Sequence, residues 1–208
     1  ASFFPTLKGE SCMLDLGANI ECDSGNLVQF AVMGQIFARL VLNLKRPTVG
    51  LLNVGSEEQK GHEELRDASA ILRQIDLPME FIGFVEGDDI TAGTVDVIVT
   101  DGFSGNIALK AAEGTSRMFT FFLKEAFGSS IYSKIGYVLS KTAINQVRER
   151  MDPRKYNGAI FLGLNGPVVK SHGGTDPKGF YHSIDLCYKI VKGDLMRQIK
   201  KNLNNPID

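Results

Sequence analysis

A buried strand that runs directly into a glycine-containing turn and an apolar helix constrains this chain more than any other feature. Residues 95–110 read VDVIVTDGFSGNIALK. The β-branched run at their start suits a strand covered on both faces, as in a parallel sheet between helical layers. Gly102 and Gly105 let a backbone approach a ligand closely, and a helix that begins after Asn106 offers unpaired N–H groups and a positive dipole end. The segment therefore predicts an anion site.

Strands and helices alternate along the first half of the chain. Hydrophobic periodicity predicts strands at 11–18, 48–54, 79–85 and 95–100 and helices at 26–42 and 63–75. This alternation predicts an α/β fold with a parallel sheet. The helix at 26–42 is apolar almost all round, so we expect burial on more than one side, with a second subunit contributing.

The C-terminal part returns to the same pattern. Residues 159–176 read AIFLGLNGPVVKSHGGTD and predict another buried strand followed by a glycine-rich turn. A long amphipathic helix is predicted from Pro177 to about Asn202, with Asp176 at its start. We expect residues 1–208 to form a single α/β domain.

Residues 115–157 are predicted to leave this domain as a protruding helical pair. The pattern changes after Gly114, and a second helix is predicted at about 131–151. The Phe-rich stretch at 118–127 is predicted to be core, with a lipid site as the alternative. Residues 128–155 carry a local charge of +4 in a chain of net charge −1, so the excursion is basic and the remainder acidic.

Composition excludes several classes of protein. Hydrophobic residues make up 43% and charged residues 23% of the chain, which excludes disordered, collagen-like and disulfide-rich chains. Three scattered cysteines indicate a reducing compartment, so we expect the cytoplasm and no structural zinc. No apolar run has transmembrane length, and the net charge argues against nucleic acid as a partner. The first residue is Ala1 rather than Met, and we expect a cut.

Familiar nucleotide and metal signatures are absent. GSEEQKG at 55–61 lacks the spacing of a P-loop, no G-x-G-x-x-G occurs, and the acidic residues fit no zinc or calcium pattern, so no metal is expected. GSEEQKG still follows a buried strand, where open α/β sheets bind ligands, and Lys60 can reach an anion from there. A solvated charged loop is the alternative.

Ser104 and His172 each have two interpretations. Ser104 follows a glycine in GFSG, but the sequence places no general base near it, so a turn or capping serine is favoured over a nucleophile. His172 lies in SHGG after a predicted strand, where an imidazole can donate to a ligand, and an ordinary loop histidine is the alternative. His62 and His182 are predicted on the surface.

A basic tip that carries aromatic side chains is predicted within the excursion. Its apolar and cationic residues are Ile131, Tyr132, Lys134, Ile135, Tyr137, Val138 and Lys141. Such a surface suits a membrane, an acidic partner protein or a second subunit. The sequence leaves these three alternatives open.

Five motifs, in order, resemble the bacterial phosphate acyltransferase (PlsX) family, the acyl-[acyl-carrier-protein]:phosphate transacylases. The motifs are LDLGAN at 14–19, GLLNVGSEEQKG at 50–61, FIGFVEG at 81–87, DGFSGNIALKAAEG at 101–114 and GLNGPVVKSHG at 163–173. The resemblance runs from Pro5 to the final helix. The DAMGGD-like opening of the family has no counterpart here, so the chain is expected to be the C-terminal portion of the family fold.

The resemblance implies a doubly wound, mostly parallel, isopropylmalate dehydrogenase-like fold and a homodimer. It implies transfer of a fatty acyl group from acyl carrier protein to inorganic phosphate, which forms acyl-phosphate for phospholipid synthesis, with no cofactor. It also implies a cytoplasmic location, with peripheral contact at the inner face of the plasma membrane and with a membrane glycerol-phosphate acyltransferase.

We assign roles to residues within these motifs as hypotheses. Lys60 and the turn at 102–106 hold phosphate through charge and helix dipole, with Gly102, Ser104, Gly105 and Asn106 contributing. Asn106 and Asn165 supply oxyanion donors. His172 gives a proton to the leaving sulfur or polarises the carbonyl, and Asp101 orients Lys60 or His172 through an ion pair.

Two rival classes remain open. A metal-dependent decarboxylating dehydrogenase of the related fold needs a carboxylate cluster and a nicotinamide pocket, and neither signature stands out. The other rival is a non-catalytic fragment that binds lipid or a partner protein.

Overall fold

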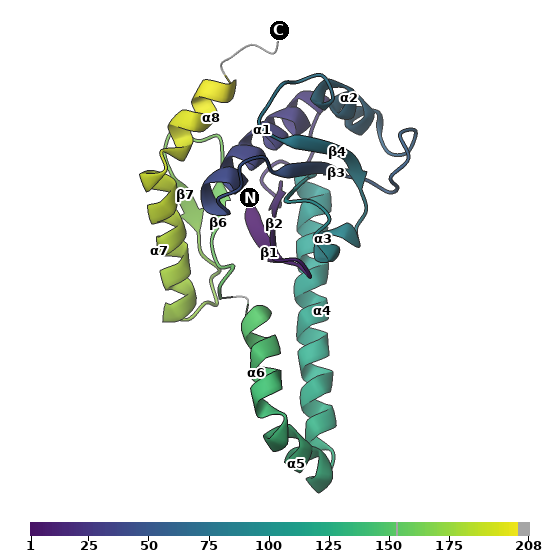
Figure 1. Ribbon diagram of the computed structural model, residues 1–208, viewed down its shortest axis with the longest axis vertical. Helices are drawn as coiled ribbons and strands as arrows, with labels where there is room; N and C mark the ends of the chain where they lie inside the picture. The colour runs from purple at the N-terminus through teal and green to yellow at the C-terminus, as the bar shows by residue number, and fades with distance from the viewer. Residues whose placement is uncertain (153, 204–208) are drawn as a thin grey trace. The chain divides into compact units, whose positions relative to one another are not determined.

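The chain forms two compact units in a computed structural model that describes residues 1–152 and 154–203. The first unit contains residues 1–106 and the described residues after 152, and the second contains residues 107–152. The sequence predicted a somewhat later excursion, at 115–157. Figure 1 labels the elements of both units.

A five-stranded, mostly parallel sheet forms the centre of the first unit. Its strands are β1 (Ser2–Pro5), β2 (Glu10–Leu14), β3 (Thr48–Leu52), β4 (Glu80–Val85) and β5 (Val97–Val99), in the order β1-β2-β5-β3-β4. Only β1 runs antiparallel to its neighbour. Val97, Ile98 and Val99 are fully buried, as the β-branched run predicted. The predicted α/β class and parallel sheet are therefore confirmed, while β1 was not predicted.

Helix α1 (Ser24–Val41) begins at a capping box and lies in the core. The Asp23 carboxylate accepts a hydrogen bond from the Asn26 amide at 2.7 Å, and the Asn26 side chain accepts one from the Asp23 amide at 3.1 Å. Residues 30–38 of α1 are buried without interruption. The sheet and helices α2 (Glu63–Leu72), α7 (Pro177–Lys192) and α8 (Leu195–Leu203) of the same chain cover it, so its composition requires no second subunit.

The C-terminal part of the first unit differs from the prediction in two places. Residues 159–170 form two short antiparallel strands, β6 (Ala159–Phe161) and β7 (Val168–Lys170), instead of one strand. The predicted single terminal helix is two helices, α7 and α8, because Asp194 adopts a positive φ of 53° between them. A Cβ atom on Gly193 would overlap the Leu40 side chain, so this break packs tightly against α1. Asp176 caps α7 as predicted, accepting from the Gly179 amide at 2.9 Å.

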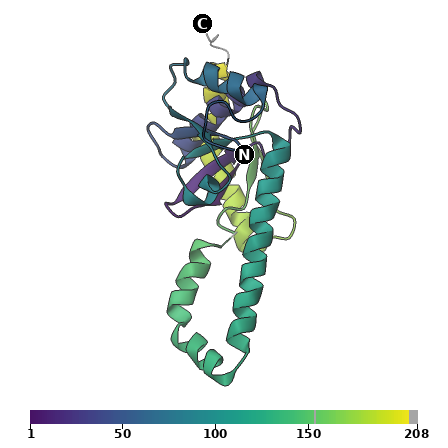
Figure 2. The same cartoon turned by 90° about the vertical axis from the view of Figure 1, so that its right-hand side faces the viewer.

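Three helices make up most of the second unit: α4 (Gly102–Gly128), which starts in the first unit, α5 (Ile131–Leu139) and α6 (Lys141–Arg150). Helix α4 continues through Gly114, and the predicted second helix is divided at Ser140 (Figure 2). Among the described residues 107–152, only Asp152 is buried. Phe119, Phe121 and Phe122 are more than half exposed, so the prediction that this stretch is core is wrong for the single chain.

No helix in the described ranges is both long enough and apolar enough to cross a membrane.

Candidate functional site

Three parallel strands end at one edge of the sheet, and the predicted site residues follow them. Leu14 of β2 and Leu51 of β3 both pair with Val99 of β5, so the three strands finish in register. The loops after β2, β5 and β3 therefore leave the same edge, which is where open α/β sheets bind ligands. Two of these loops and the start of α4 form the candidate phosphate site.

Asp15 closes the loop after β2 around its own carboxylate. One carboxylate oxygen accepts hydrogen bonds from the Gly17 and Ala18 amides at 2.9 Å, and the other accepts from the amide and side chain of Asn19 at 2.7 Å. Burial raises the pKa of Asp15, but these hydrogen bonds outweigh it and hold the pKa below the usual carboxyl value. Three loop amides thus bind an internal anion. Strand β2 ends at Leu14, immediately before this loop and earlier than predicted.

Helix α4 packs its first turn directly on this loop. The Gly102 amide donates to the Asn19 carbonyl at 2.7 Å. A Cβ atom on Gly102 would overlap that carbonyl, and one on Gly105 would overlap the carbonyl of Asp15. Both glycines are therefore needed for a close approach between helix and loop, whereas the sequence analysis assigned that approach to a ligand.

The first-turn amides of α4 donate to internal acceptors. The helix begins at Gly102, five residues earlier than predicted. The Ser104 amide donates to the Asp101 carboxylate at 2.8 Å, and the Gly105 amide donates to the Asp101 carbonyl at 3.0 Å. Asp101 is thus a helix cap, and within the described ranges no ion pair joins it to Lys60 or His172.

The side chain of Asn106 lies over Gly17 and faces solvent. A Cβ atom on Gly17 would stand 3.5 Å from the Cβ atom of Asn106, which is ordinary van der Waals contact. Gly17 has a φ of 120°, a value that disfavours any other residue. The Asn106 amide group is exposed, with no hydrogen-bond partner among the residues described, so it can donate to a ligand at this edge.

The loop after β3 holds Lys60 at its backbone. The buried side chain of Asn53 donates to the Lys60 carbonyl at 3.0 Å, and its oxygen leaves no room for a Cβ atom on Gly61. The ammonium group of Lys60 pairs with the Glu57 carboxylate at 2.8 Å. Its hydrogen bond to Glu57 raises the pKa of Lys60, so the lysine remains a cation at neutral pH.

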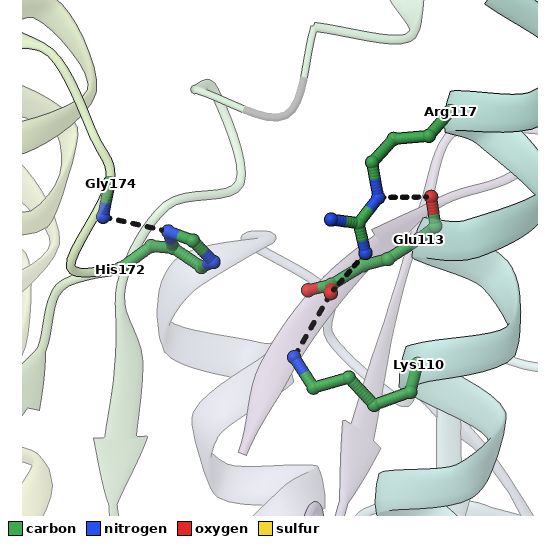
Figure 3. A network of polar contacts seen from close by, with 5 residues as sticks. All are labelled: Lys110, Glu113, Arg117, His172 and Gly174. Carbon is green, nitrogen blue, oxygen red and sulfur yellow. Dashed lines mark hydrogen bonds and ion pairs between the residues drawn. The ribbon is translucent and has the colours of Figure 1, made fainter.

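His172 lies in a turn after β7, with one ring nitrogen engaged. Its Nδ1 accepts a hydrogen bond from the Gly174 amide at 3.1 Å (Figure 3), so the neutral imidazole carries its proton on Nε2. Asn165 is exposed in the connection between β6 and β7. No hydrogen bond in the described ranges links His172 or Asn165 to Lys60 or Asn106.

The predicted tip residues lie on α5 and at the start of α6. Ile131, Tyr132, Ile135 and Val138 are each more than half exposed, Lys134 and Lys141 are exposed, and Tyr137 packs edge-on against Phe127 at 5.4 Å between ring centroids. On α4, Glu113 accepts from Lys110 at 3.0 Å and pairs with Arg117 at 3.7 Å (Figure 3). This network lies along one helix face.

Sequence reasoning missed three organising residues: Asp15, Asn53 and Asn157. Each is a short polar residue at the end of a strand or before one, where Asp and Asn side chains often bind nearby backbone groups. One sequence signal was available: each of these residues is followed, one to eight positions later, by a glycine that allows a turn. The glycines are Gly17, Gly61 and Gly158. In the residues that the structure covers, no cluster of three or more His, Cys, Asp or Glu side chains is arranged to hold a metal ion.

Comparison with known proteins places these features in a family. The chain is 62% identical to the phosphate acyltransferase of Rhodospirillum centenum over 203 residues, which are 98% of this chain and 57% of that protein. It is 56% identical to the phosphate acyltransferases of Paramagnetospirillum magneticum and Agrobacterium fabrum, over 98% of this chain and 58% of each relative. The chain thus spans less than two thirds of the length of these relatives. The model of the fatty acid synthesis protein family matches residues 1–198, and the chain belongs to that family.

Proposed function

We propose that this chain provides part of an enzyme that transfers a fatty acyl group from acyl carrier protein to inorganic phosphate. The observation that carries the proposal is the 62% identity to a phosphate acyltransferase across nearly all of this chain. The names of the relatives do not favour the dehydrogenase. The other rival, a non-catalytic fragment that binds lipid or a partner protein, would be favoured if no acyl-phosphate forms in the assay.

The reaction requires positioning more than covalent chemistry from the protein. A phosphate oxygen attacks the thioester carbonyl carbon, and a tetrahedral oxyanion forms. The C–S bond then breaks, which gives acyl-phosphate and a thiolate that takes up a proton. Phosphate is already an anionic nucleophile at neutral pH, so the site has to orient it, stabilise the oxyanion and supply that proton.

We assign phosphate to Lys60, to the side chain of Asn106 and to the start of α4. The cation of Lys60 and the helix dipole both favour an anion there. Because the amides of Gly102, Ser104 and Gly105 already donate internally, we assign the two glycines to shaping the turn. The Ser104 hydroxyl, which makes no hydrogen bond in the described ranges, is the further donor.

We assign proton donation to His172 and an oxyanion contact to Asn165. The Nδ1 acceptor role of His172 supports this, because it leaves the proton on the exposed Nε2 atom. Asp101 has no direct role in this scheme. It holds the first turn of α4 through Ser104.

The assignment is tested by replacing Lys60 and Asn106 separately with alanine. Acyl-phosphate is trapped with hydroxylamine at subsaturating phosphate, in this chain and in the full-length Rhodospirillum centenum relative with the corresponding changes. We expect at least a tenfold loss of rate, which disappears in part as phosphate is raised. Unchanged phosphate dependence in both variants would remove them from the site.

We further propose a homodimer and peripheral membrane contact through the second unit. Residues 107–152 bury no apolar side chain, and Phe119, Phe121 and Phe122 are exposed. This supports contact of these side chains with another molecule. The lysines of the tip suit anionic lipid headgroups or the acidic carrier protein. Light scattering tests the dimer, and flotation with anionic vesicles at low salt tests the membrane.

The finer fold and location also remain proposals. We propose that the sheet is part of a doubly wound, isopropylmalate dehydrogenase-like fold, which the alternating strands and helices support. We propose a cytoplasmic location, at the inner face of the plasma membrane where a membrane glycerol-phosphate acyltransferase would take the product.

A further inference from the structure

The buried side chain of Asn157 connects three separate segments of the first unit. Its Nδ2 group lies 2.8 Å from the Gly179 carbonyl and 2.9 Å from the Ser183 hydroxyl, both on α7. The same group lies 2.9 Å from the Ser171 hydroxyl, after β7. Its Oδ1 atom accepts the His172 amide at 2.9 Å. Only 8% of the Asn157 surface is exposed, so its two N–H groups and its Oδ1 atom meet these partners in a place where a polar group without a partner costs stability.

The contact to His172 has a different consequence from the other three. It holds the backbone at the first residue of a turn that the His172 carbonyl closes by accepting the Thr175 amide at 3.1 Å. Within that turn the Gly174 amide donates to Nδ1 of the imidazole. The turn therefore determines which ring nitrogen of the neutral His172 side chain carries the proton. Asn157 holds the backbone of that turn.

We propose that Asn157 is a positioning residue for His172, which keeps its imidazole in the Nε2–H form that can donate a proton. The proposal rests on the proposed function only for the use of that proton, which is its donation to the leaving thiolate. The effect on the ring itself can be measured without turnover. Sequence reasoning passed over Asn157 because its partners lie 14 to 26 residues away along the chain.

The contacts to α7 offer a matched control. Ser183→Ala removes one partner of Asn157 on α7 and leaves the His172 contact in place, so it costs stability without touching the turn. Asn157→Ala removes the contact to Ser183 and the contact to His172. If Asn157 were only a structural tie between α7 and β7, the two variants would differ in stability alone.

The test is nitrogen NMR of His172 in Asn157→Ala and Ser183→Ala, with acyl-phosphate formation measured alongside. We expect the Nε2–H form to dominate in the unaltered protein and in Ser183→Ala, and to give way to a mixture in Asn157→Ala. We also expect kcat to fall at least fivefold in Asn157→Ala, with the KM for phosphate unchanged. A folded Asn157→Ala that keeps the Nε2–H form would overturn the proposal.

Two further measurements keep the outcomes distinct. Hydrogen exchange of the unaltered protein applies even if Asn157→Ala does not fold: the His172 amide should exchange at least tenfold more slowly than that of Gly173, and equal rates would overturn the proposal. His172→Gln tests the proposed function instead. Full activity there, together with a shifted tautomer in Asn157→Ala, would refute the catalytic role of His172 and leave the positioning by Asn157 standing.

Discussion

Gly105 of α4 lies directly against the carbonyl oxygen of Asp15, so that a Cβ atom at position 105 would overlap it. This contact joins the strand-to-helix turn to the loop after β2. The turn and the loop carry two of the sequence motifs, and Asn106 follows Gly105 immediately. The position of Asn106 over Gly17 is thus a result of glycine at 105.

Gly105→Ala is expected to lower the free energy of unfolding by about 1–3 kcal/mol, because an added methyl group forces helix and loop apart. Thermal or urea unfolding measures the change. The matched control is Gly114→Ala in the same helix, where a Cβ atom meets nothing within 4 Å. That variant should gain up to about 1 kcal/mol from helix propensity. Equal changes in the free energy of unfolding in Gly105→Ala and Gly114→Ala would show that the close contact at Gly105 does not contribute to stability.

Asp15→Asn is expected to destabilise the protein more at neutral pH than at low pH. The pKa of Asp15 lies below its usual value when folded, so its ionised form adds stability above the unfolded pKa of about 3.9. That contribution is lost as pH falls through the folded pKa. Unfolding free energies of both proteins from pH 7 downward should converge. A pH-independent difference would contradict the prediction.

Glu57→Gln is expected to lower the KM for phosphate. The Glu57 carboxylate forms an ion pair with the ammonium group of Lys60 at 2.8 Å and so competes with phosphate for it. Glutamine lacks the negative charge and accepts only a weaker hydrogen bond, so the pKa of Lys60 is raised less, but a lysine without this partner is still charged near pH 7. Glu58→Gln is the control, since Glu58 pairs with Arg73 instead. The same decrease in both variants would point to overall charge rather than to release of Lys60.

Cys12 is expected to resist thiol reagents while the protein is folded. Burial raises its pKa to about 12, so at pH 8 only about one thiol in 10,000 is ionised. Cys22 and Cys187 are both partly exposed and should react before Cys12. Mass spectrometry of the labelled protein identifies the sites, and all three cysteines should react in denaturant. Rapid labelling of Cys12 in buffer would contradict its burial in β2.

The strands and their partners show how far sequence reasoning reached. The run at 95–100 was long, β-branched and flanked by turn residues, and it became the central strand β5. The terminal helix was predicted as one piece because its apolar periodicity hardly changes at Gly193, whereas packing against Leu40 divides it. The Phe-rich segment was predicted as core because apolar composition marks a surface that needs cover, without saying which molecule covers it.

The sequence by itself determined the α/β class, the strand that leads into the turn and the residues gathered near it, since these depend on local periodicity and on motifs read along the chain. Only the tertiary structure decided what the glycines and amides of that turn contact. Gly102 and Gly105 admit the loop at Asp15 and Asn19, and Asp101 takes the amides expected to face phosphate. Hydrogen-bond partners are chosen by which groups meet in space, and the partner loop lies more than 80 residues earlier in the chain.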